Sequence, residues 1–162
     1  MSYSVILARC VVARYIIDCM MKTISDEDYR ALSEFRYEIR KFLMVSEKIA
    51  RSHRLQPQQY MVLLTLRGLR PNQEPTIIFL AERLQIRHHS AVGLINRLAK
   101  RRFIRRCRSK ADSRKTLIRL TSAGNALIEE VVRMRFVELA SSQPMLLTAL
   151  GRIVRIAKSS DG

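Results

Sequence analysis

At 162 residues with 48% hydrophobic content, the chain can bury one sizeable core and is too short for two independent domains to be expected. Its net charge of +16 favours a polyanionic partner, such as nucleic acid, over an acidic small substrate. Its three cysteines form no CxxC pair and have no histidine beside them at metal-ligand spacing, so a protein held together by disulfides or zinc is not expected. The odd number of cysteines favours a reducing, cytoplasmic location.

The first predicted element is an extra N-terminal segment, residues 1–21. Three charged side chains interrupt its apolar run and it lacks an Ala-x-Ala cleavage signal, so neither a membrane span nor a secretory signal is expected. The segment is interpreted either as an additional helix or as a consequence of start-codon choice, with Met20 or Met21 as the natural start. An amphipathic membrane anchor is a further alternative, although the favoured interpretation involves no membrane.

A domain of residues 22–162 then begins with a long helix. Ser25 followed by Asp28 resembles a capping box, which marks a helix start. From Asp26 to about His53, small or apolar residues recur at steps of three and four, so the segment 26–55 is predicted as a helix. A helix of this length needs a partner for its apolar stripe.

Three shorter helices are predicted next. Pro57 suits the first turn of a helix over 57–69, and Thr76 is a good N-cap for a helix that ends near residue 84. After a tight turn over 85–88, a further helix runs to about Arg102. Two short helices joined in this way form a helix-turn-helix, whose second helix can lie in the DNA major groove.

The rest of the chain is predicted as a β-hairpin and two helices. Strands over 103–109 and 115–120 flank a polar loop over 110–114, then one helix runs over 121–141 and another over 144–156. The predicted fold class is therefore mainly α with a small β-hairpin.

The excess charge is concentrated on the second helix of the helix-turn-helix and on the hairpin. Between Arg87 and Arg119 there are twelve Lys or Arg residues and one acid, a net +11 in 33 residues. Val92, Ile95 and Leu98 are predicted to face inward. The residues predicted outside or at the edges of this helix, as DNA contacts, are His88, His89, Ser90, Gly93, Asn96, Arg97 and Lys100. Asn and Arg side chains can bind adenine and guanine edges in bidentate fashion, so Asn96 and Arg97 are the predicted base readers; the alternative is a solvated helix face.

Several motifs together resemble the MarR family of winged-helix transcription regulators over about residues 29–157. Asp112-Ser-Arg114 followed by Leu120-Thr-Ser-Ala-Gly124 is similar to the family's Asp-x-Arg wing tip and Leu-Thr-x-x-Gly helix entry. Leu80-Ala-Glu-Arg-Leu84 and Ile104-Arg105-Arg106 are similar to its flanking segments. The resemblance implies a winged helix-turn-helix over 57–120.

The resemblance also implies roles for the wing and the terminal helices. Arg114 enters the minor groove and Asp112 positions it, unless Asp112 only initiates the turn. The wing residues assigned to DNA binding are Arg108, Lys110, Asp112, Arg114 and Lys115. Segments 26–55 and 121–158 become dimerisation helices, so that a homodimer meets a pseudo-palindromic operator with half-sites about one DNA turn, ~34 Å, apart.

The end of the recognition helix departs from the family pattern. Where relatives usually have glycine at the end of the recognition helix, this chain has Arg102. A left-handed conformation there costs a non-glycine residue about 1 to 2 kcal/mol. Either the helix ends differently, or attraction to phosphate offsets the strain.

Regulation is predicted by the resemblance alone. Relatives commonly bind small aromatic or phenolic anions between the dimerisation helices and the winged domain, which implies a repressor that an effector releases from DNA. The residues predicted to line such a cleft are Arg36, Arg40, His53, Arg54 and Tyr60, each of which is otherwise a surface or helix-end residue. The rival mechanism is redox control through Cys107 among its arginines, unless strand alternation buries that thiol.

The residues also bear on two other classes of function. An RNA- or ribosome-associated basic protein is the main alternative, although Phe103 is the only aromatic residue of the basic stretch. No phosphate-binding loop, nucleophile motif or pair of acids indicates an enzyme, and no cofactor is expected. Adjacent His88 and His89 point about 100° apart on a helix, so no metal site is expected either.

Overall fold

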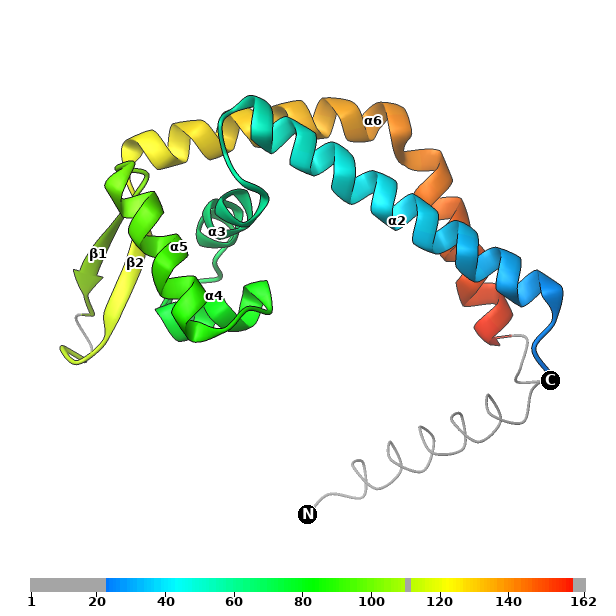
Figure 1. Ribbon diagram of the computed structural model, residues 1–162, viewed down its shortest axis with the longest axis horizontal. Coiled ribbons are helices and arrows are strands. Elements are labelled where there is room, and N and C mark those ends of the chain that lie inside the picture. The colour runs from blue at the N-terminus through cyan, green and yellow to red at the C-terminus, as the bar shows by residue number, and fades with distance from the viewer. Residues whose placement is uncertain (1–22, 110–111, 159–162) are drawn as a thin grey trace, which may run out of the picture. The chain divides into compact units, whose positions relative to one another are not determined.

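The computed structural model describes residues 23–109 and 112–158, which form five helices and one two-stranded antiparallel sheet (Figure 1). In chain order these are α2 (Asp26–Ser52), α3 (Pro57–Arg67), α4 (Ile77–Leu84), α5 (His88–Lys100), β1 (Ile104–Arg108), β2 (Thr116–Leu120) and α6 (Ser122–Lys158). The mainly α fold with a small hairpin is confirmed. Residues 1–21, for which an extra helix, a start-codon effect or a membrane anchor was predicted, lie outside the described residues. Among the described residues, no helix is long and apolar enough to cross a membrane.

The described residues divide into two compact units. One contains the residues up to Leu43 and those from Ser142 onward, and the other is Met44–Ser141. Helices α2 and α6 each contribute to both units, whereas α3, α4, α5 and the hairpin lie wholly in the second.

The predicted caps form as the sequence indicated. The Ser25 hydroxyl accepts from the Asp28 amide and the Ser25 amide donates to the Asp28 carboxylate, at 3.2 and 2.9 Å, which completes a capping box at α2. Thr76 Oγ1 accepts from the Phe79 amide at 3.2 Å and so caps α4. Each cap satisfies amide groups that the first helical turn leaves unpaired.

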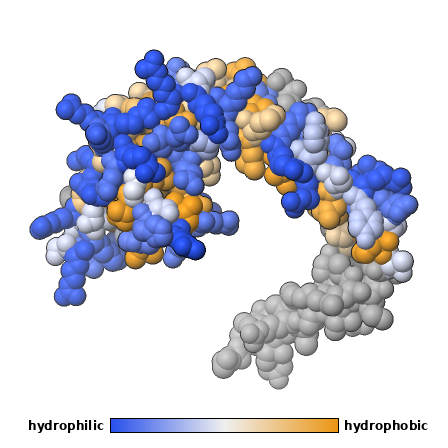
Figure 2. Space-filling view, in the orientation of Figure 1, coloured by the Kyte–Doolittle hydropathy of each residue, from blue (hydrophilic) through white to orange (hydrophobic). Residues whose placement is uncertain are grey.

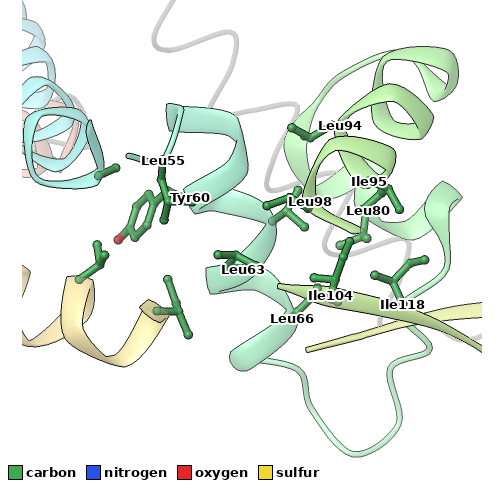
Figure 3. Packing of buried hydrophobic residues seen from close by; sticks show 14 residues of the cluster. Leu55, Tyr60, Leu63, Leu66, Leu80, Leu94, Ile95, Leu98, Ile104 and Ile118 are labelled. Carbon is green, nitrogen blue, oxygen red and sulfur yellow. The ribbon is translucent and has the colours of Figure 1, made fainter. Parts of the chain in front are cut away.

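The core of the Met44–Ser141 unit lies where α3, α4, α5 and the hairpin converge (Figure 3). Its most buried labelled side chains are Leu55, Leu63, Leu80, Ile95, Leu98 and Ile118, each at most 1% exposed. On α5 the inward face is Ala91, Leu94, Ile95 and Leu98. Val92, which was predicted to face inward, is only half-buried, because the 100° step per residue centres the stripe on Leu94 and Ile95.

The helical prediction was wrong at the C-terminal end. Two helices were predicted, one ending near Ser141 and one beginning at Pro144, but α6 is a single helix over Ser122–Lys158. Inside a helix a proline removes one hydrogen bond and its ring crowds the carbonyl four residues earlier, which is why a break was predicted, but the helix continues past this position.

Three helices end on a left-handed residue that is not glycine. Arg54, Gln85 and Arg102 have φ angles of 56°, 54° and 60°, whereas Gly68 at the end of α3 has a φ of −91°. At α5 the Phe103 amide donates to the Leu98 carbonyl and the Arg102 amide to the Ala99 carbonyl, which is the Schellman pattern. The helix therefore ends on a left-handed residue of the kind that glycine adopts without strain, and Arg102 bears that strain.

The hairpin is attached to the helices along one edge. In its ladder Arg105 lies opposite Arg119 and Arg106 opposite Ile118. On the outer edge of β2, the Ile118 amide donates to the Pro75 carbonyl at 2.9 Å. The loop before α4 thus fixes the position of the wing relative to the helix-turn-helix.

Candidate nucleic-acid interface

Helix α5, the predicted recognition helix, presents its predicted polar face to solvent. His88, His89, Ser90, Asn96, Arg97 and Lys100 are exposed and Gly93 is half-buried. On the side shown in Figure 2, the surface over α5 and the hairpin is mostly hydrophilic. The amides of the first turn of α5 add the positive end of the helix dipole to this face, which favours a phosphate there.

Gly93 lies beneath the side chain of Arg97. A methyl group at Gly93 would meet the Arg97 guanidinium at 3.4 Å and no other group outside the local helix within 4 Å. The glycine therefore leaves room for Arg97 to extend along the exposed face and for another backbone or base to approach α5 closely.

We expect Gly93→Ala to separate stability from binding. Alanine in a helix interior is favoured over glycine by about 0.5 to 1 kcal/mol, so the melting temperature should rise. The added methyl group would meet the Arg97 guanidinium only at van der Waals contact distance, so we expect DNA binding to weaken severalfold because the methyl group stands where a base or backbone would approach α5. Thermal unfolding and fluorescence anisotropy on the same preparation check both results, and unchanged DNA affinity would mean that nothing approaches Gly93.

Asn96, a predicted base reader, has a partner on the wing. Arg106 Nη2 donates to Asn96 Oδ1 at 2.7 Å, and both side chains are exposed. The hairpin and the recognition helix are therefore joined by a polar contact at the surface that was predicted to face DNA.

The wing turn is organised by Asp112. The Arg114 amide donates to Asp112 Oδ1 and the Lys115 amide donates to the Asp112 carbonyl, both at 3.0 Å. Asp112 thus initiates the turn, and in doing so it orients the backbone that carries Arg114. The Arg114 side chain is exposed, as is that of Arg108, and Lys110 lies outside the described residues.

Lys115, predicted as a DNA contact, is paired with the protein. Its Nζ lies 2.6 Å from Glu74 Oε2, on the loop before α4. The hydrogen bond with Glu74 and the charge of that carboxylate raise the pKa of Lys115. Half of the Lys115 side chain remains exposed, so this ion pair joins the wing to the helix-turn-helix within reach of solvent ions.

An open hollow of about 500 Å³ brings the recognition helix and the wing together. It is lined by Glu74, Thr76, Ile77, Ile78, His88, Arg114, Lys115 and Thr116. Predicted DNA contacts from the start of α5 and from the wing tip thus border one concave surface.

Arg101 has a structural role that the sequence did not reveal. Its Nη1 donates to the Arg54 carbonyl at 2.7 Å and to Gln59 Oε1 at 3.2 Å, and its guanidinium lies 4.7 Å from the centre of the Phe103 ring. This cation satisfies a carbonyl at the end of α2 and fastens the end of α5 to α3. No spacing in the sequence distinguishes Arg101 from its basic neighbours.

The end of the recognition helix is also joined to the start of α6. Thr121 Oγ1 donates to the Arg102 carbonyl at 2.7 Å and accepts from the Gly124 amide at 3.1 Å. A Cβ on Gly124 would lie only 2.0 Å from the Phe103 carbonyl oxygen. Gly124 is therefore required for α6 to approach the chain this closely.

Replacing Arg102 with glycine should make the protein more stable and a weaker DNA binder. Relief of the left-handed strain at φ 60° should add about 1 kcal/mol to the free energy of unfolding, while an exposed cation is lost. Arg54→Gly is the matched control, since it relieves the same strain and removes the same charge. Equal DNA affinity of Arg102→Gly and the unmodified protein at moderate salt would show that Arg102 contacts no phosphate.

The residues predicted to line an effector cleft do not line this hollow. His53 is half-buried, with Nδ1 2.9 Å from the Ile49 carbonyl and Nε2 3.4 Å from Glu130 Oε1. Tyr60 is buried, and burial raises its pKa. Arg54 is exposed at the end of α2; Arg36 and Arg40 are exposed on the part of α2 that belongs to the other unit.

Two further titratable side chains are buried or half-buried. Arg135, 6% exposed, forms an ion pair with Glu138, and burial lowers the pKa of Arg135. Cys107 on β1 is half-buried with a free thiol. Within residues 23–109 and 112–158, no three His, Cys, Asp or Glu side chains cluster as a metal site would require.

Known proteins share this arrangement. Residues 54–115 match the sequence model of the MarR family. Among solved structures, AbsC, a MarR family transcriptional regulator from Streptomyces coelicolor, is similar at 19% identity over 86% of this chain and 97% of that one, with a TM-score of 0.66. The comparison with curated protein sequences gave no match.

Two further solved structures are similar and carry functional information about those proteins. An S. aureus MepR mutant bound to an oligodeoxyribonucleotide has 21% identity over 67% of this chain and 78% of that one, with a TM-score of 0.57. A structure concerning regulation of DNA binding of Bordetella bronchiseptica BpsR by 6-hydroxynicotinic acid has 25% identity over 78% and 90%, with a TM-score of 0.56.

Proposed function

We propose that this protein is a DNA-binding transcription regulator that recognises a specific duplex sequence, since residues 54–115 match the sequence model of the MarR family. The observation that carries the proposal is the hollow bordered by His88 on α5 and by Arg114 on the wing. A helix that enters the major groove and a wing that enters the adjacent minor groove need this relative placement.

The electrostatics support a polyanionic partner at the same surface. Within the part of the chain that the structure describes, several exposed cations of α5, its N-cap residue and the hairpin have no ion-pair partner. They are Arg87, Arg97, Lys100, Arg105, Arg108, Arg114 and Arg119. Such cations gain free energy by releasing counterions from nucleic acid, which makes the affinity strongly dependent on salt.

The proposed active form is a homodimer. In the smaller unit, large apolar side chains of two helices are exposed, namely Tyr29, Leu32, Tyr37 and Leu43 of α2 and Met145, Leu147, Leu150 and Val154 of α6. An Arg152–Glu27 ion pair joins these helices. Exposed apolar surface on this scale favours burial against a second copy, which would present two recognition helices to a pseudo-palindromic operator.

Release by a small aromatic or phenolic anion is proposed for regulation, with repression as the output. BpsR, whose DNA binding is regulated by 6-hydroxynicotinic acid, is the precedent among the similar structures. Near Tyr60, the buried Arg135, which is paired with Glu138, interacts electrostatically with the phenol and is the cation that we propose an anionic effector approaches. The alternatives are an RNA-binding role and redox control through Cys107. No enzymatic activity is proposed.

Fluorescence anisotropy tests the proposal. The protein is titrated into labelled DNA from upstream of its own coding sequence, with a shuffled duplex as competitor, at two salt concentrations. We expect one dimer per pseudo-palindrome and a preference for the operator of about 10³-fold or more. Equal binding to both duplexes, with only a steep salt dependence, would contradict sequence recognition and would direct attention to RNA.

A further inference from the structure

The contact between the wing and the recognition helix assigns a role to Arg106. We propose that Arg106 is a positioning residue that determines specificity: it orients the amide of Asn96 so that Asn96 recognises guanine in the major groove in preference to adenine. This inference rests on the proposed function and goes beyond it, since it names the base that one position of the operator should contain.

Strand geometry places Arg106 on the side of the hairpin that faces α5. Side chains alternate along a strand, so Arg106 shares a face with Ile104, and its cross-strand partner is Ile118. Both isoleucines are buried, at 3% and 0% exposure, in the core beneath α5. Beyond the edge of that core, the Arg106 guanidinium reaches Asn96 at 2.7 Å.

Asn96 lies on the face of α5 that is free to meet DNA. It stands three residues after Gly93 and four before Lys100, so these residues form one stripe on the helix. None of the three belongs to the buried core. The hydrogen bond from Arg106 on the hairpin therefore fixes the orientation of the Asn96 amide, while the position of Asn96 on α5 directs its side chain outward.

The direction of the hydrogen bond decides what the amide can recognise. A bidentate contact to adenine requires the amide oxygen to accept from N6 while the amide nitrogen donates to N7. Here the oxygen already accepts from a guanidinium, whose other N–H groups would oppose an adenine amino group. The Asn96 NH₂ group keeps two donors, and guanine offers two neighbouring acceptors, N7 and O6.

Selection from random duplexes with the full-length protein tests the proposal. The operator position to examine is the one at which Asn96→Ala loses base preference, and we expect guanine there in the unmodified protein. Replacing that guanine with 7-deazaguanine should weaken binding about tenfold, because N7 is lost. Inosine, which keeps N7 and O6, should bind within about twofold of guanine.

Variants of the hairpin separate orientation of the amide from loss of charge. Arg106→Ala should reduce the guanine-over-adenine preference at this position at least about fivefold, whereas Arg106→Lys, which can still donate to the amide oxygen, should retain it. Arg105→Ala is the matched control, because Arg105 is adjacent, exposed and on the other face, opposite Arg119. It should weaken all duplexes by the same factor.

The outcomes are distinct. Adenine at the Asn96-dependent position, or identical base preferences for Arg106→Ala and Arg105→Ala, would overturn the role of Arg106 and leave the regulator proposal intact. Enrichment of no sequence by the unmodified protein would overturn both. Because both side chains of the pair are exposed, the variants should melt within a few degrees of the unmodified protein, which thermal unfolding verifies.

Discussion

Gly124→Ala is expected to lower the free energy of unfolding by about 3 kcal/mol or more. The new Cβ would lie 2.0 Å from the Phe103 carbonyl oxygen and 2.9 Å from its carbonyl carbon. These are backbone atoms, held by the Schellman ending of α5 and by the Thr121 hydroxyl, so they cannot move aside as a flexible side chain would. Chemical denaturation followed by circular dichroism measures the loss.

Gly151→Ala, in the same helix, is the control for this prediction. Nothing lies within 4 Å of a Cβ built at Gly151, so alanine there should stabilise the protein by about 0.5 to 1 kcal/mol through helix propensity. Opposite signs for the two substitutions would establish that the cost at Gly124 is steric. A Gly124→Ala variant as stable as the unmodified protein would show that α6 does not approach Phe103 this closely.

Arg114→Ala is expected to remove most of the preference for the operator over a shuffled duplex. Arg114 is exposed at the wing tip, and the Asp112 carboxylate orients its backbone amide. A minor-groove arginine responds to groove width and shape, so its loss costs discrimination as well as charge. We expect about 1 to 3 kcal/mol per wing, measured by competition anisotropy.

Arg119→Ala provides the charge-matched comparison. Arg119 is exposed on β2, away from the tip, and its loss should weaken binding to both duplexes equally. It should also flatten the dependence of log K on log salt by no more than about two, one for each subunit of the dimer. If Arg114→Ala behaved in the same way as Arg119→Ala, the wing tip would contribute charge without sequence recognition.

Much of the fold could be predicted because local rules determine it. Ser25, Thr76 and Thr121 cap helices where short side chains can accept from amides of the first turn. Apolar spacing located helices α2 to α5, the start of α6 and the hairpin. The break predicted before Pro144 was wrong, since α6 continues through this position although an interior proline costs a hydrogen bond and crowds the preceding turn.

The polar contacts of the interface could not be predicted in the same way. Arg101, Arg106 and Lys115 each bind a protein group that is 10 to 47 residues distant in sequence. A long flexible cation can reach many partners, and the periodicity of the sequence does not identify which one it selects. The stretch that looked uniformly available for DNA therefore contains cations that hold the helix end, the base reader and the wing in place.

The contacts between the end of α5 and the start of α6 couple the orientations of the two helices. Because the Thr121 hydroxyl and the close approach of Gly124 tie the Arg102–Phe103 backbone to the first turn of α6, the two helix ends must move together. The 13-residue recognition helix α5 extends about 20 Å from this point of contact. A tilt of ten degrees at the joint would displace the far end of that helix by about 3.5 Å, a distance comparable to one base-pair step. A small rotation of α6 would thus produce its largest displacement at the N-terminal end of α5.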